Sequence, residues 1–290
     1  MLEVVEMSRT SLSRSGEMET PYGLLEEAIV ASVSRASMYL RSAFVGRKPV
    51  GVGRGGDVSR EFDVVVESIV YRTLRDYLGD IELVSEEAGS TGSGSWLAVL
   101  DPVDGSINFE AGIPLASISL GISRNHEYAK IEDIEAAAVA EVFRDIIYYY
   151  DRSTGFRTIG AKIERKAKPS DIILGYFESL ESFKPHLNFS KTMNPRPRLR
   201  SLGSAALDVV YVSLGIAMGF IDARARLRNV DIASSIAIAR SLGAKAYLCS
   251  GVDAASITIR EVAKVDCVVV GYSEDIARKL LEAVSSSRYE

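Results

Sequence analysis

The sequence predicts a layered α/β or α+β fold, and three observations carry this prediction. Short apolar runs that suit strands alternate with segments in which apolar residues recur at helical spacing. Some of the expected strands follow one another as hairpins, whereas others are separated by expected helices, a mixture typical of layered folds. The 290 residues, 47% of them hydrophobic and 25% charged, suffice for one large or two ordinary domains with a sizeable core.

In the first half of the chain, Thr20-Pro21 suits a helix start, with Thr as the cap and Pro at the first helical position. Apolar spacing predicts helices over 22–44 and 62–78 and strands over 81–85, 96–100, 116–123, 136–143 and 146–150. Residues 46–56 are expected to form a glycine-rich loop or hairpin, and residues 88–95 a flexible Gly/Ser loop.

The second half is expected to alternate, with strands over 172–177, 218–222, 246–249 and 267–270. Helices are expected over 204–215, with Ser204 as the cap, over 231–242, with Gly243 as the stop, and over 273–284. The three prolines within 183–198 favour an irregular segment there. The polar stretch 152–170 suggests a division into a lead-in (1–20), an N-terminal domain (21–155) and a C-terminal domain (156–290).

Composition narrows the function classes. A net charge of −5 gives no electrostatic case for binding nucleic acid. No apolar run is long enough to cross a membrane, and the N-terminus lacks the apolar core of a secretory signal, so we expect a cytoplasmic protein without a membrane partner. For Cys249 and Cys267, the only cysteines, we expect two buried free thiols rather than a disulfide.

The strongest chemical signal is the segment from Asp101 to Phe109, which reads Asp-Pro-Val-Asp-Gly-Ser-Ile-Asn-Phe. It follows an expected buried strand, and Pro102 interrupts that strand, so Asp101 and Asp104 are expected where a strand ends and a turn begins. Carboxylate oxygens beside the backbone N–H groups of a Gly-Ser turn suit a divalent cation and a phosphate together. The only histidines, His126 and His186, lie outside the acidic motifs, which favours Mg²⁺, Mn²⁺ or Ca²⁺ over zinc.

Three further acidic segments join this motif as candidates: Asp57 with Asp63, Glu86-Glu87, and Asp231. Each has an ordinary structural interpretation when taken alone. Asp57 suits a turn, Glu86-Glu87 a solvated bend, and Asp231 a helix N-cap. They form one site only if the fold brings them together.

Taken jointly, these motifs resemble the inositol monophosphatase superfamily of Mg²⁺-dependent phosphatases, which also includes fructose-1,6-bisphosphatases. The segment 101–109 matches the superfamily motif at every defined position, and Ser85-Glu86-Glu87 matches the motif that precedes it. The segments 202–208 and 230–235 are similar to two later motifs. The resemblance spans about residue 22 to the end of the chain. It implies a sugar-phosphatase-like α-β-α-β-α sandwich and a homodimer.

The resemblance also implies a role for each matching residue. The metal ligands would be the side chains of Glu86, Asp101, Asp104 and Asp231 and the carbonyl of Val103, with Glu87 behind them or near a further ion. The catalytic residues would be Glu86, Asp57 and Ser106. The residues in contact with substrate would be Asp104, Gly105, Ser106, Gly203 and Ser204. Two or three Mg²⁺ ions, or Mn²⁺, would activate water against a phosphate ester. A proton would pass from that water to Glu86, or to Ser106 paired with Asp57.

The chain departs from the superfamily pattern at three places. Val230 replaces a Trp before the last metal Asp, and Arg60 replaces a Thr in the first motif. Residues 222–228 carry arginines at spacing two, which predicts an exposed edge strand or loop with all three on one side. Arg224 and Arg226 are either solvated or bind a second phosphate or a polyol. This stretch resembles archaeal members that act on both inositol monophosphate and fructose 1,6-bisphosphate.

The leading hypothesis is therefore a Mg²⁺-dependent phosphomonoesterase acting on inositol monophosphate, fructose 1,6-bisphosphate or both. A second hypothesis is a phosphatase of 3′-phosphoadenosine phosphate or NADP, which shares the metal core. The third is a metal-binding regulatory scaffold without catalysis, against which the complete set of carboxylates argues.

Overall fold

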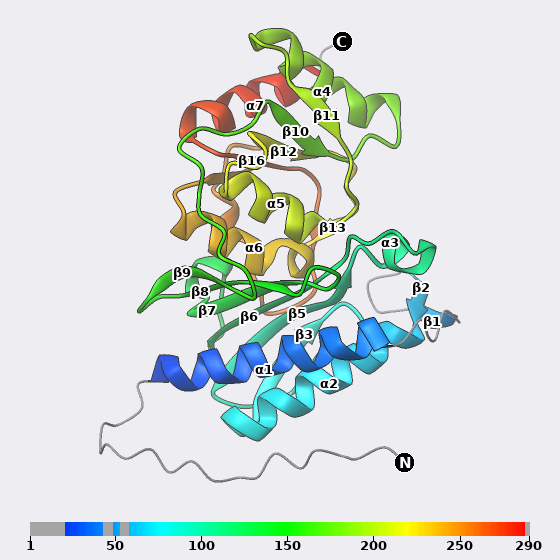
Figure 1. Ribbon diagram of the computed structural model, residues 1–290, viewed down its shortest axis with the longest axis vertical. Helices are drawn as coiled ribbons and strands as arrows, with labels where there is room; N and C mark the ends of the chain where they lie inside the picture. The colour runs from blue at the N-terminus through cyan, green and yellow to red at the C-terminus, as the bar shows by residue number, and fades with distance from the viewer. Residues whose placement is uncertain (1–20, 43–48, 53–57, 288–290) are drawn as a thin grey trace.

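The computed structural model describes residues 21–42, 49–52 and 58–287. Its main helices and sheets stack in five layers, so that two helices, a sheet, two helices, a sheet and two helices follow one another (Figure 1). The α-β-α-β-α sandwich that the resemblance implies is confirmed. Among the described residues, no helix combines the length and the apolar character that crossing a bilayer requires.

The helices are α1 (Pro21–Ser42), α2 (Glu61–Leu78), α3 (Ser106–Ala111), α4 (Leu180–Thr192), α5 (Ala205–Ser213), α6 (Asn229–Ser241) and α7 (Glu274–Ser287), with 3₁₀ turns at Ile131–Asp133 and Ala254–Ser256. The strands of the first half are β1 (Pro49–Val52), β2 (Val58–Arg60), β3 (Ile81–Ser85), β4 (Gly89–Gly92), β5 (Trp96–Asp104), β6 (Ser117–Arg124), β7 (Ala136–Glu141), β8 (Ile146–Asp151) and β9 (Gly155–Ile159). Those of the second half are β10 (Ile172–Gly175), β11 (Arg198–Arg200), β12 (Gly219–Asp222), β13 (Leu227–Arg228), β14 (Lys245–Leu248), β15 (Lys264–Val265) and β16 (Val268–Gly271).

The larger sheet has seven strands in the order β4-β3-β5-β6-β7-β8-β9. Only β3 and β5 are parallel neighbours in it, and the other pairs are antiparallel. One face buries an apolar cluster with α1 and α2, to which Leu25 and Phe62 belong. The other face buries a second cluster with α5 and α6, to which Val210 and Ile236 belong. Apolar residues on both faces explain why β5 is buried along its whole length.

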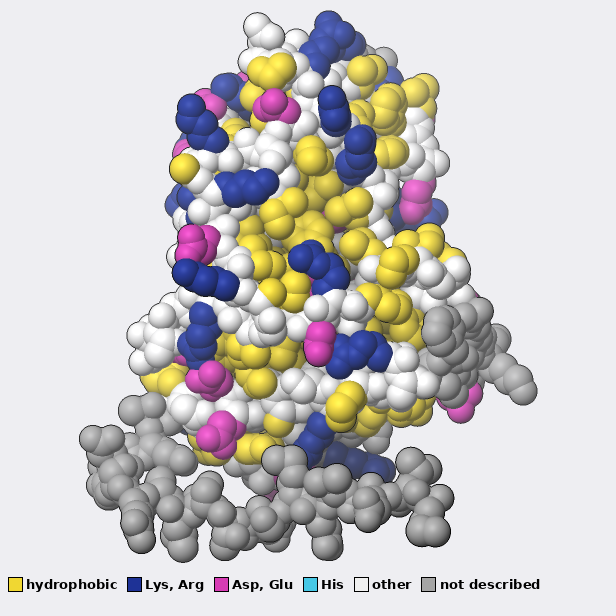
Figure 2. Space-filling model, viewed as in Figure 1, with side chains coloured by type: hydrophobic (Ala, Val, Ile, Leu, Met, Phe, Trp, Pro, Cys, Tyr) yellow, Lys and Arg dark blue, Asp and Glu magenta, His cyan; other side chains and the backbone are white. Residues whose placement is uncertain are grey.

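The smaller sheet has five strands in the order β11-β10-β12-β16-β14, with α5 and α6 on one side and α4 and α7 on the other (Figure 1). Because α5 and α6 lie between the sheets, one apolar cluster includes residues from both sheets. The division into domains at residues 155 and 156 stays a prediction. On the face drawn in Figure 2, Lys and Arg side chains are interspersed with acidic and apolar ones rather than gathered into one basic area.

Three segments differ from expectation. The predicted Gly/Ser loop 88–95 contains β4, which pairs with β3, and the polar stretch 152–170 contains β9, which pairs with β8. The Gly- and Ser-rich β4 has low strand propensity, so its pairing with β3 holds it extended, whereas Phe156, Thr158 and Ile159 favour a strand in β9. The segment 183–198, expected to be irregular, overlaps α4, which begins at the capping residue Ser179 and includes Pro185. The other two prolines lie after the end of α4.

The expectation of two free thiols is wrong, because Cys249 and Cys267 form a disulfide. The strands β14 and β16 are antiparallel neighbours in which Leu248 pairs with Val268, so the residues just beyond this pair face each other. Sequence spacing alone does not reveal this pairing, which depends on a long-range strand contact.

Replacing both cysteines with alanine is expected to lower the free energy of unfolding by about 3 kcal/mol, the value typical of a closed loop of this size. Chemical denaturation of the oxidised protein and of the double variant measures the difference. A reducing agent should lower the stability of the unsubstituted protein and leave the variant unchanged. Equal stability of the unsubstituted protein with and without reductant would contradict the expectation.

Candidate metal centre

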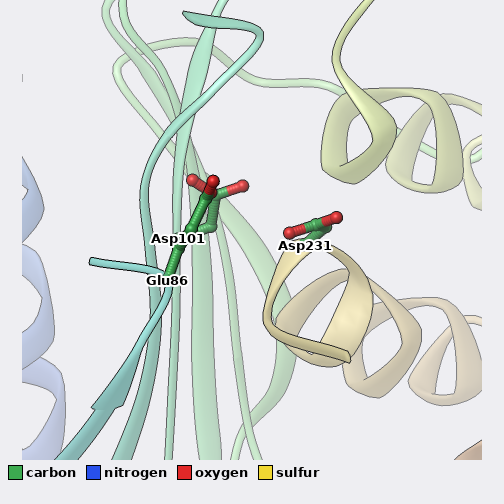
Figure 3. A group of neighbouring side chains, drawn as sticks. All are labelled: Glu86, Asp101 and Asp231. Carbon is green, nitrogen blue, oxygen red and sulfur yellow. The ribbon is translucent and has the colours of Figure 1, made fainter. Parts of the chain in front are cut away.

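Three predicted metal ligands, Glu86, Asp101 and Asp231, converge at one point. Each offers a carboxylate oxygen, and these oxygens all lie within 4.8 Å of one another. Figure 3 shows Glu86 and Asp101 side by side at the sheet and Asp231 facing them from α6. Hard carboxylate oxygens at this spacing fit a divalent cation such as Mg²⁺.

The parallel pair β3 and β5 places the first two acids. Ser85, the last residue of β3, pairs with Leu100 of the parallel strand β5, so Glu86 in the turn after β3 lies beside Asp101. The pairing of β5 with β6 becomes irregular between Asp101 and Asp104. There the backbone N–H of Val103 donates to Oδ1 of Asp101 at 3.1 Å, which holds the carboxylate in a turn.

Asp231 comes from the first turn of α6, where the backbone N–H of Arg228 donates to its Oδ2 at 2.8 Å. Asp231 is therefore not the N-cap that its sequence position suggests, because Arg228 takes that place, but it contributes to the capping box from the third position of the helix. The same placement puts it opposite the sheet, so the capping role and a ligand role are compatible. The positive end of the α6 dipole also faces the acidic cluster.

The cluster has strong charge repulsion. The pKa values of Asp101 and Asp231 are raised well above the ordinary value of an aspartate. Burial is the largest cause, and the negative charge of Glu86 is the second. Asp101 is only 3% exposed. A bound cation would remove this repulsion and keep the carboxylates ionised, so the donor set present fits the metal that the resemblance implies.

Asp104 lies next to this cluster but is held by different contacts. Its Oδ1 accepts from the backbone N–H of Ala205 at 3.0 Å, and its Oδ2 accepts from that of Ala206 at 2.8 Å. The hydroxyls of Ser117 and Ser204 also donate to Oδ2, at 3.1 and 2.5 Å. Burial raises the pKa of Asp104 to about 6, and these hydrogen bonds oppose a larger shift. Asp104 thus anchors the end of β5 to the start of α5.

Two glycines of the predicted phosphate and substrate region lie against each other. Gly105 has φ of +89°, which L-residues with a side chain rarely adopt, and a Cβ there would lie 2.9 Å from the carbonyl oxygen of Gly203. Gly203 lies directly before Ser204, which takes the predicted N-cap position of α5 although its hydroxyl contacts Asp104 instead of the helix. The backbone contact between Gly105 and Gly203 therefore brings these two motifs together.

Ser106 begins α3, and its hydroxyl accepts from Nη1 of Arg60 at 3.2 Å. The same arginine pairs through Nε with Glu110 at 3.0 Å. Arg60, which stands where the superfamily has a Thr, thus touches the predicted catalytic hydroxyl. Its proposed partner Asp57 lies outside the described residues. Glu87 follows Glu86 in the turn after β3, and its role and that of the Val103 carbonyl stay predictions.

Sequence reasoning missed two charged residues beside the cluster. Asp63, considered only for its spacing from Asp57, is buried in the first turn of α2. Burial, followed by the charges of Glu87 and Glu86, raises its pKa to about 8. Arg228 forms an ion pair with Glu86 and is 7% exposed. Their closeness in sequence to the site could have identified them, since Asp63 and Arg228 each lie within six residues of a predicted site residue.

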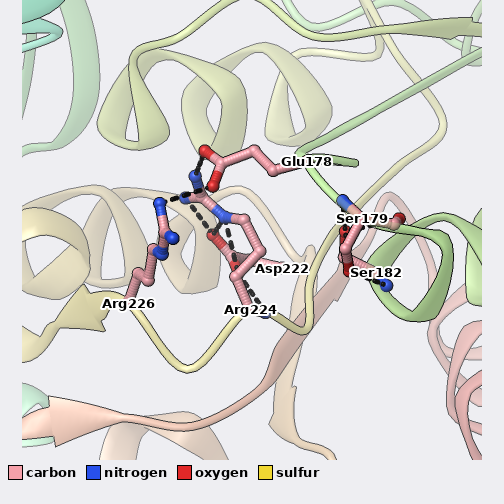
Figure 4. Close-up of polar contacts among 6 residues, drawn as sticks. All are labelled: Glu178, Ser179, Ser182, Asp222, Arg224 and Arg226. Atoms are coloured by element: carbon pink, nitrogen blue, oxygen red, sulfur yellow. Dashed lines mark hydrogen bonds and ion pairs between the residues drawn. The ribbon is translucent and has the colours of Figure 1, made fainter.

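The expectation that the three arginines of 222–228 lie exposed on one side is wrong for Arg228, which is buried against Glu86. Arg224 and Arg226 both reach Glu178 instead (Figure 4). Arg224 also pairs with the buried Asp222, Nη2 to Oδ2 at 2.6 Å, and its guanidinium carbon lies 3.9 Å from the ring centre of Tyr176. The guanidinium of Arg224 is therefore largely buried in contacts within the protein, whereas the side chain of Arg226 is 70% exposed.

Comparison with known proteins gives a consistent result. The family model described as the inositol monophosphatase family matches residues 24–288. An inositol-1-monophosphatase of Aeropyrum pernix is 32% identical over 222 residues, which cover 74% of this chain and 81% of that protein. A fructose-1,6-bisphosphatase/inositol-1-monophosphatase of Methanocaldococcus jannaschii is 31% identical over 209 residues, which cover 69% of this chain and 77% of that protein.

Among solved structures, an inositol monophosphatase-fructose 1,6-bisphosphatase superposes with a TM-score of 0.71 at 26% identity. The match covers 89% of this chain and 98% of that one. The family match spans every described residue of the candidate metal centre. From the sequence motifs, the five-layer fold and these matches, we conclude that the chain belongs to the inositol monophosphatase family and resembles its archaeal dual-specificity members.

Proposed function

We propose that the protein is a Mg²⁺-dependent phosphomonoesterase that hydrolyses inositol monophosphate, fructose 1,6-bisphosphate or both. The observation that carries this proposal is the convergence of Glu86, Asp101 and Asp231, whose carboxylate oxygens lie within 4.8 Å of one another where β3 and β5 meet the start of α6. A protein that had lost catalysis would have no need to keep such mutually repelling carboxylates together. The names of the archaeal relatives support the choice of substrates.

In this proposal, two or three Mg²⁺ ions, or Mn²⁺, are held by Glu86, Asp101, Asp104, Asp231 and the carbonyl of Val103. When bound, such ions lower the pKa of water and neutralise charge on the phosphoryl group. The buried acids contribute fixed negative charge at the place where the cations are needed. Glu87, next to Glu86, would lie behind this set or near a further ion.

The protein's own residues then orient the substrate and move a proton. The backbone N–H groups of Gly105 and Ser106 would hold the phosphate at the end of β5. Glu86, or Ser106 together with Asp57, would accept the proton of the attacking water. The contact between Arg60 and Ser106, 3.2 Å from Nη1 to Oγ, would orient that hydroxyl. Gly203 would contact the polyol, whereas the buried Asp104 and Ser204, which are hydrogen-bonded to each other, would support this part of the site.

Of the arginines in residues 222–228, Arg224 or Arg226 would help to hold a second phosphate or a polyol. Arg226 is the better placed of the two predicted residues, because its side chain is largely exposed and its contact with Glu178 is open to solvent. Arg224 would act mainly by holding the loop, given its internal pairs. Homodimerisation, implied by the family resemblance, stays a prediction that light scattering would test.

A substrate panel tests the proposal. Phosphate release is measured from inositol 1-phosphate, fructose 1,6-bisphosphate, 3′-phosphoadenosine 5′-phosphate and NADP, with Mg²⁺ and with a chelator. We expect turnover of one or both of the first two, and loss of it on chelation. Turnover confined to the two nucleotides would favour the second sequence hypothesis. Activity that survives chelation would contradict the metal mechanism, and a complete lack of turnover would favour a regulatory scaffold.

Mg²⁺ is expected to stabilise the protein more at about pH 8 than at about pH 5. The folded-state pKa values of Asp63 (about 8) and Asp104 (about 6) exceed the unfolded value of roughly 3.9. The stability that these protonated groups contribute is complete below about pH 4 and is lost as the pH rises through the folded-state values. Without metal, the melting temperature should therefore fall as the pH rises from about 4 to about 8. At low pH, Mg²⁺ must displace protons before it binds.

Thermal unfolding with Mg²⁺ and with a chelator, at both pH values, measures this effect. At saturation about 100-fold above Kd, linkage gives roughly 2.7 kcal/mol of stabilisation. Ca²⁺ serves as a comparison cation, and Na⁺ at equal ionic strength as the control. A Mg²⁺ effect that is equal at the two pH values, or matched by Na⁺, would contradict the expectation.

A further inference from the structure

Arg228 lies beside the acidic cluster, and two of its contacts with the cluster fall within the described part of the chain. Its guanidinium forms an ion pair with Glu86, and its backbone N–H donates to Oδ2 of Asp231 at 2.8 Å. Glu86 in turn has an oxygen within 4.8 Å of oxygens of Asp101 and Asp231. The guanidinium therefore places a permanent positive charge beside one of the four carboxylates that the proposed function assigns to the cations.

The main chain of Arg228 is well anchored, whereas its contact with Glu86 is made by the end of the side chain. Arg228 pairs with Lys264 between β13 and β15 and occupies the cap position of α6. The next residue, Asn229, donates from its side chain to the carbonyls of Thr258 and Glu261, both at 2.7 Å. Rotation of the Arg228 side chain could thus release Glu86 without moving the backbone that holds Asp231.

We propose that Arg228 is a built-in counter-cation, which neutralises Glu86 in the metal-free protein and gives up this contact when a divalent ion binds. The inference rests on the proposed metal function. An arginine suits this role because its charge is permanent and its fork of donors matches a carboxylate. Leaving buried carboxylates without any compensating charge would destabilise the fold, so the metal-free protein benefits from the pair.

The alternative is that Arg228 orients Glu86 in both states, and the two roles predict opposite effects on metal affinity. A contact that exists only in the metal-free state must be broken on binding, so it weakens binding by linkage. A contact that persists in both states and orients the ligand strengthens binding. The direction in which Mg²⁺ affinity changes on removing the guanidinium therefore decides between them.

The experiment compares Arg228→Gln and Arg228→Lys with the unsubstituted protein by calorimetric Mg²⁺ titration and by thermal unfolding after chelation. Arg240→Gln is the matched control. Arg240 lies near the end of α6, the helix that Arg228 caps, and its guanidinium pairs with the carboxylate of Asp253 at 3.0 Å, away from the acidic cluster. We expect Arg228→Gln to lower the metal-free melting temperature and to tighten Mg²⁺ binding by about 5–10-fold. Arg228→Lys keeps the positive charge but lacks the planar fork of donors, so its melting temperature and Mg²⁺ affinity should lie between those of the unsubstituted protein and those of Arg228→Gln.

Unchanged or weaker Mg²⁺ binding by Arg228→Gln would overturn the inference, as would an equal effect of Arg240→Gln. If the glutamine variant does not fold, the lysine variant decides in the same way. These results differ from failure of the proposed function, in which the unsubstituted protein itself binds no Mg²⁺ and hydrolyses no phosphomonoester. Both affinity and stability are read without substrate, so the outcome does not depend on activity.

Discussion

Replacing Arg224 with methionine is expected to destabilise the protein by about 3–5 kcal/mol, because it leaves a buried carboxylate without its partner. Asp222 is only 1% exposed. It accepts from Arg224 through the backbone N–H at 2.9 Å, through Nε at 3.1 Å and through Nη2 at 2.6 Å. The stacking of the guanidinium on Tyr176, 3.9 Å from the ring centre, would be lost as well.

Urea denaturation of single and double variants measures this effect. Adding Asp222→Asn to the Arg224 variant removes the uncompensated charge and should recover part of the lost stability. Arg226→Met is the matched control, since its ion pair with Glu178 is solvent-exposed and should contribute no more than about 1 kcal/mol. Equal losses for the two methionine variants would contradict the idea that Arg224 has a mainly internal role.

Replacing Asp101 with asparagine is expected to lower kcat by about 1,000-fold, which corresponds to roughly 4 kcal/mol of lost transition-state stabilisation. Asp101 is the member of the cluster that the pairing of β3 with β5 places beside Glu86. The asparagine keeps the shape of the side chain and can still accept from the N–H of Val103. It removes a carboxylate whose own pKa is raised by burial and by the charges of its acidic neighbours, so the metal-free protein should be at least as stable as before.

Steady-state kinetics over a range of Mg²⁺ concentrations, with thermal unfolding of the same samples, tests this expectation. Asp253→Asn is the control, because Asp253 is an acidic residue that pairs with Arg240 away from the cluster. We expect weaker Mg²⁺ binding and lower kcat for Asp101→Asn alone. If its activity matched that of the control, Asp101 would have no place in the proposed metal centre.

The sequence was sufficient for many features that depend on local contacts. In the segment from Asp101 to Phe109, the Gly-Ser turn follows the buried strand as predicted. The strand does not end at the proline, however, because β5 continues through Pro102 to Asp104 with an irregular register. The strand 81–85 and the helix 62–78 were predicted to within a residue because their apolar spacing is regular. The convergence of Glu86, Asp101 and Asp231 was predicted from family resemblance, since no local pattern indicates which strands become neighbours.

Most of the features that were missed depend on a partner segment that local spacing does not identify. The strand β4 is rich in Gly and Ser and forms because the preceding strand β3 pairs with it as a hairpin. The disulfide requires the register of β14 with β16. The contact of Arg228 with Glu86 joins residues far apart in sequence, so the spacing of the arginines suggested a solvated edge instead. Local propensity carries no information about such partners.

The origin of the three acids has a consequence for the dynamics of the protein. Glu86 and Asp101 belong to the larger sheet, whereas Asp231 belongs to a helix of the neighbouring layer (Figure 3). A cation shared by them would add a cross-link between two layers that already meet through apolar side chains and through the hydrogen bonds of Asp104 to the start of α5. Separating α6 from the sheet would then require losing the ion, so amide hydrogen exchange in the first turn of α6 would report on occupancy of the centre.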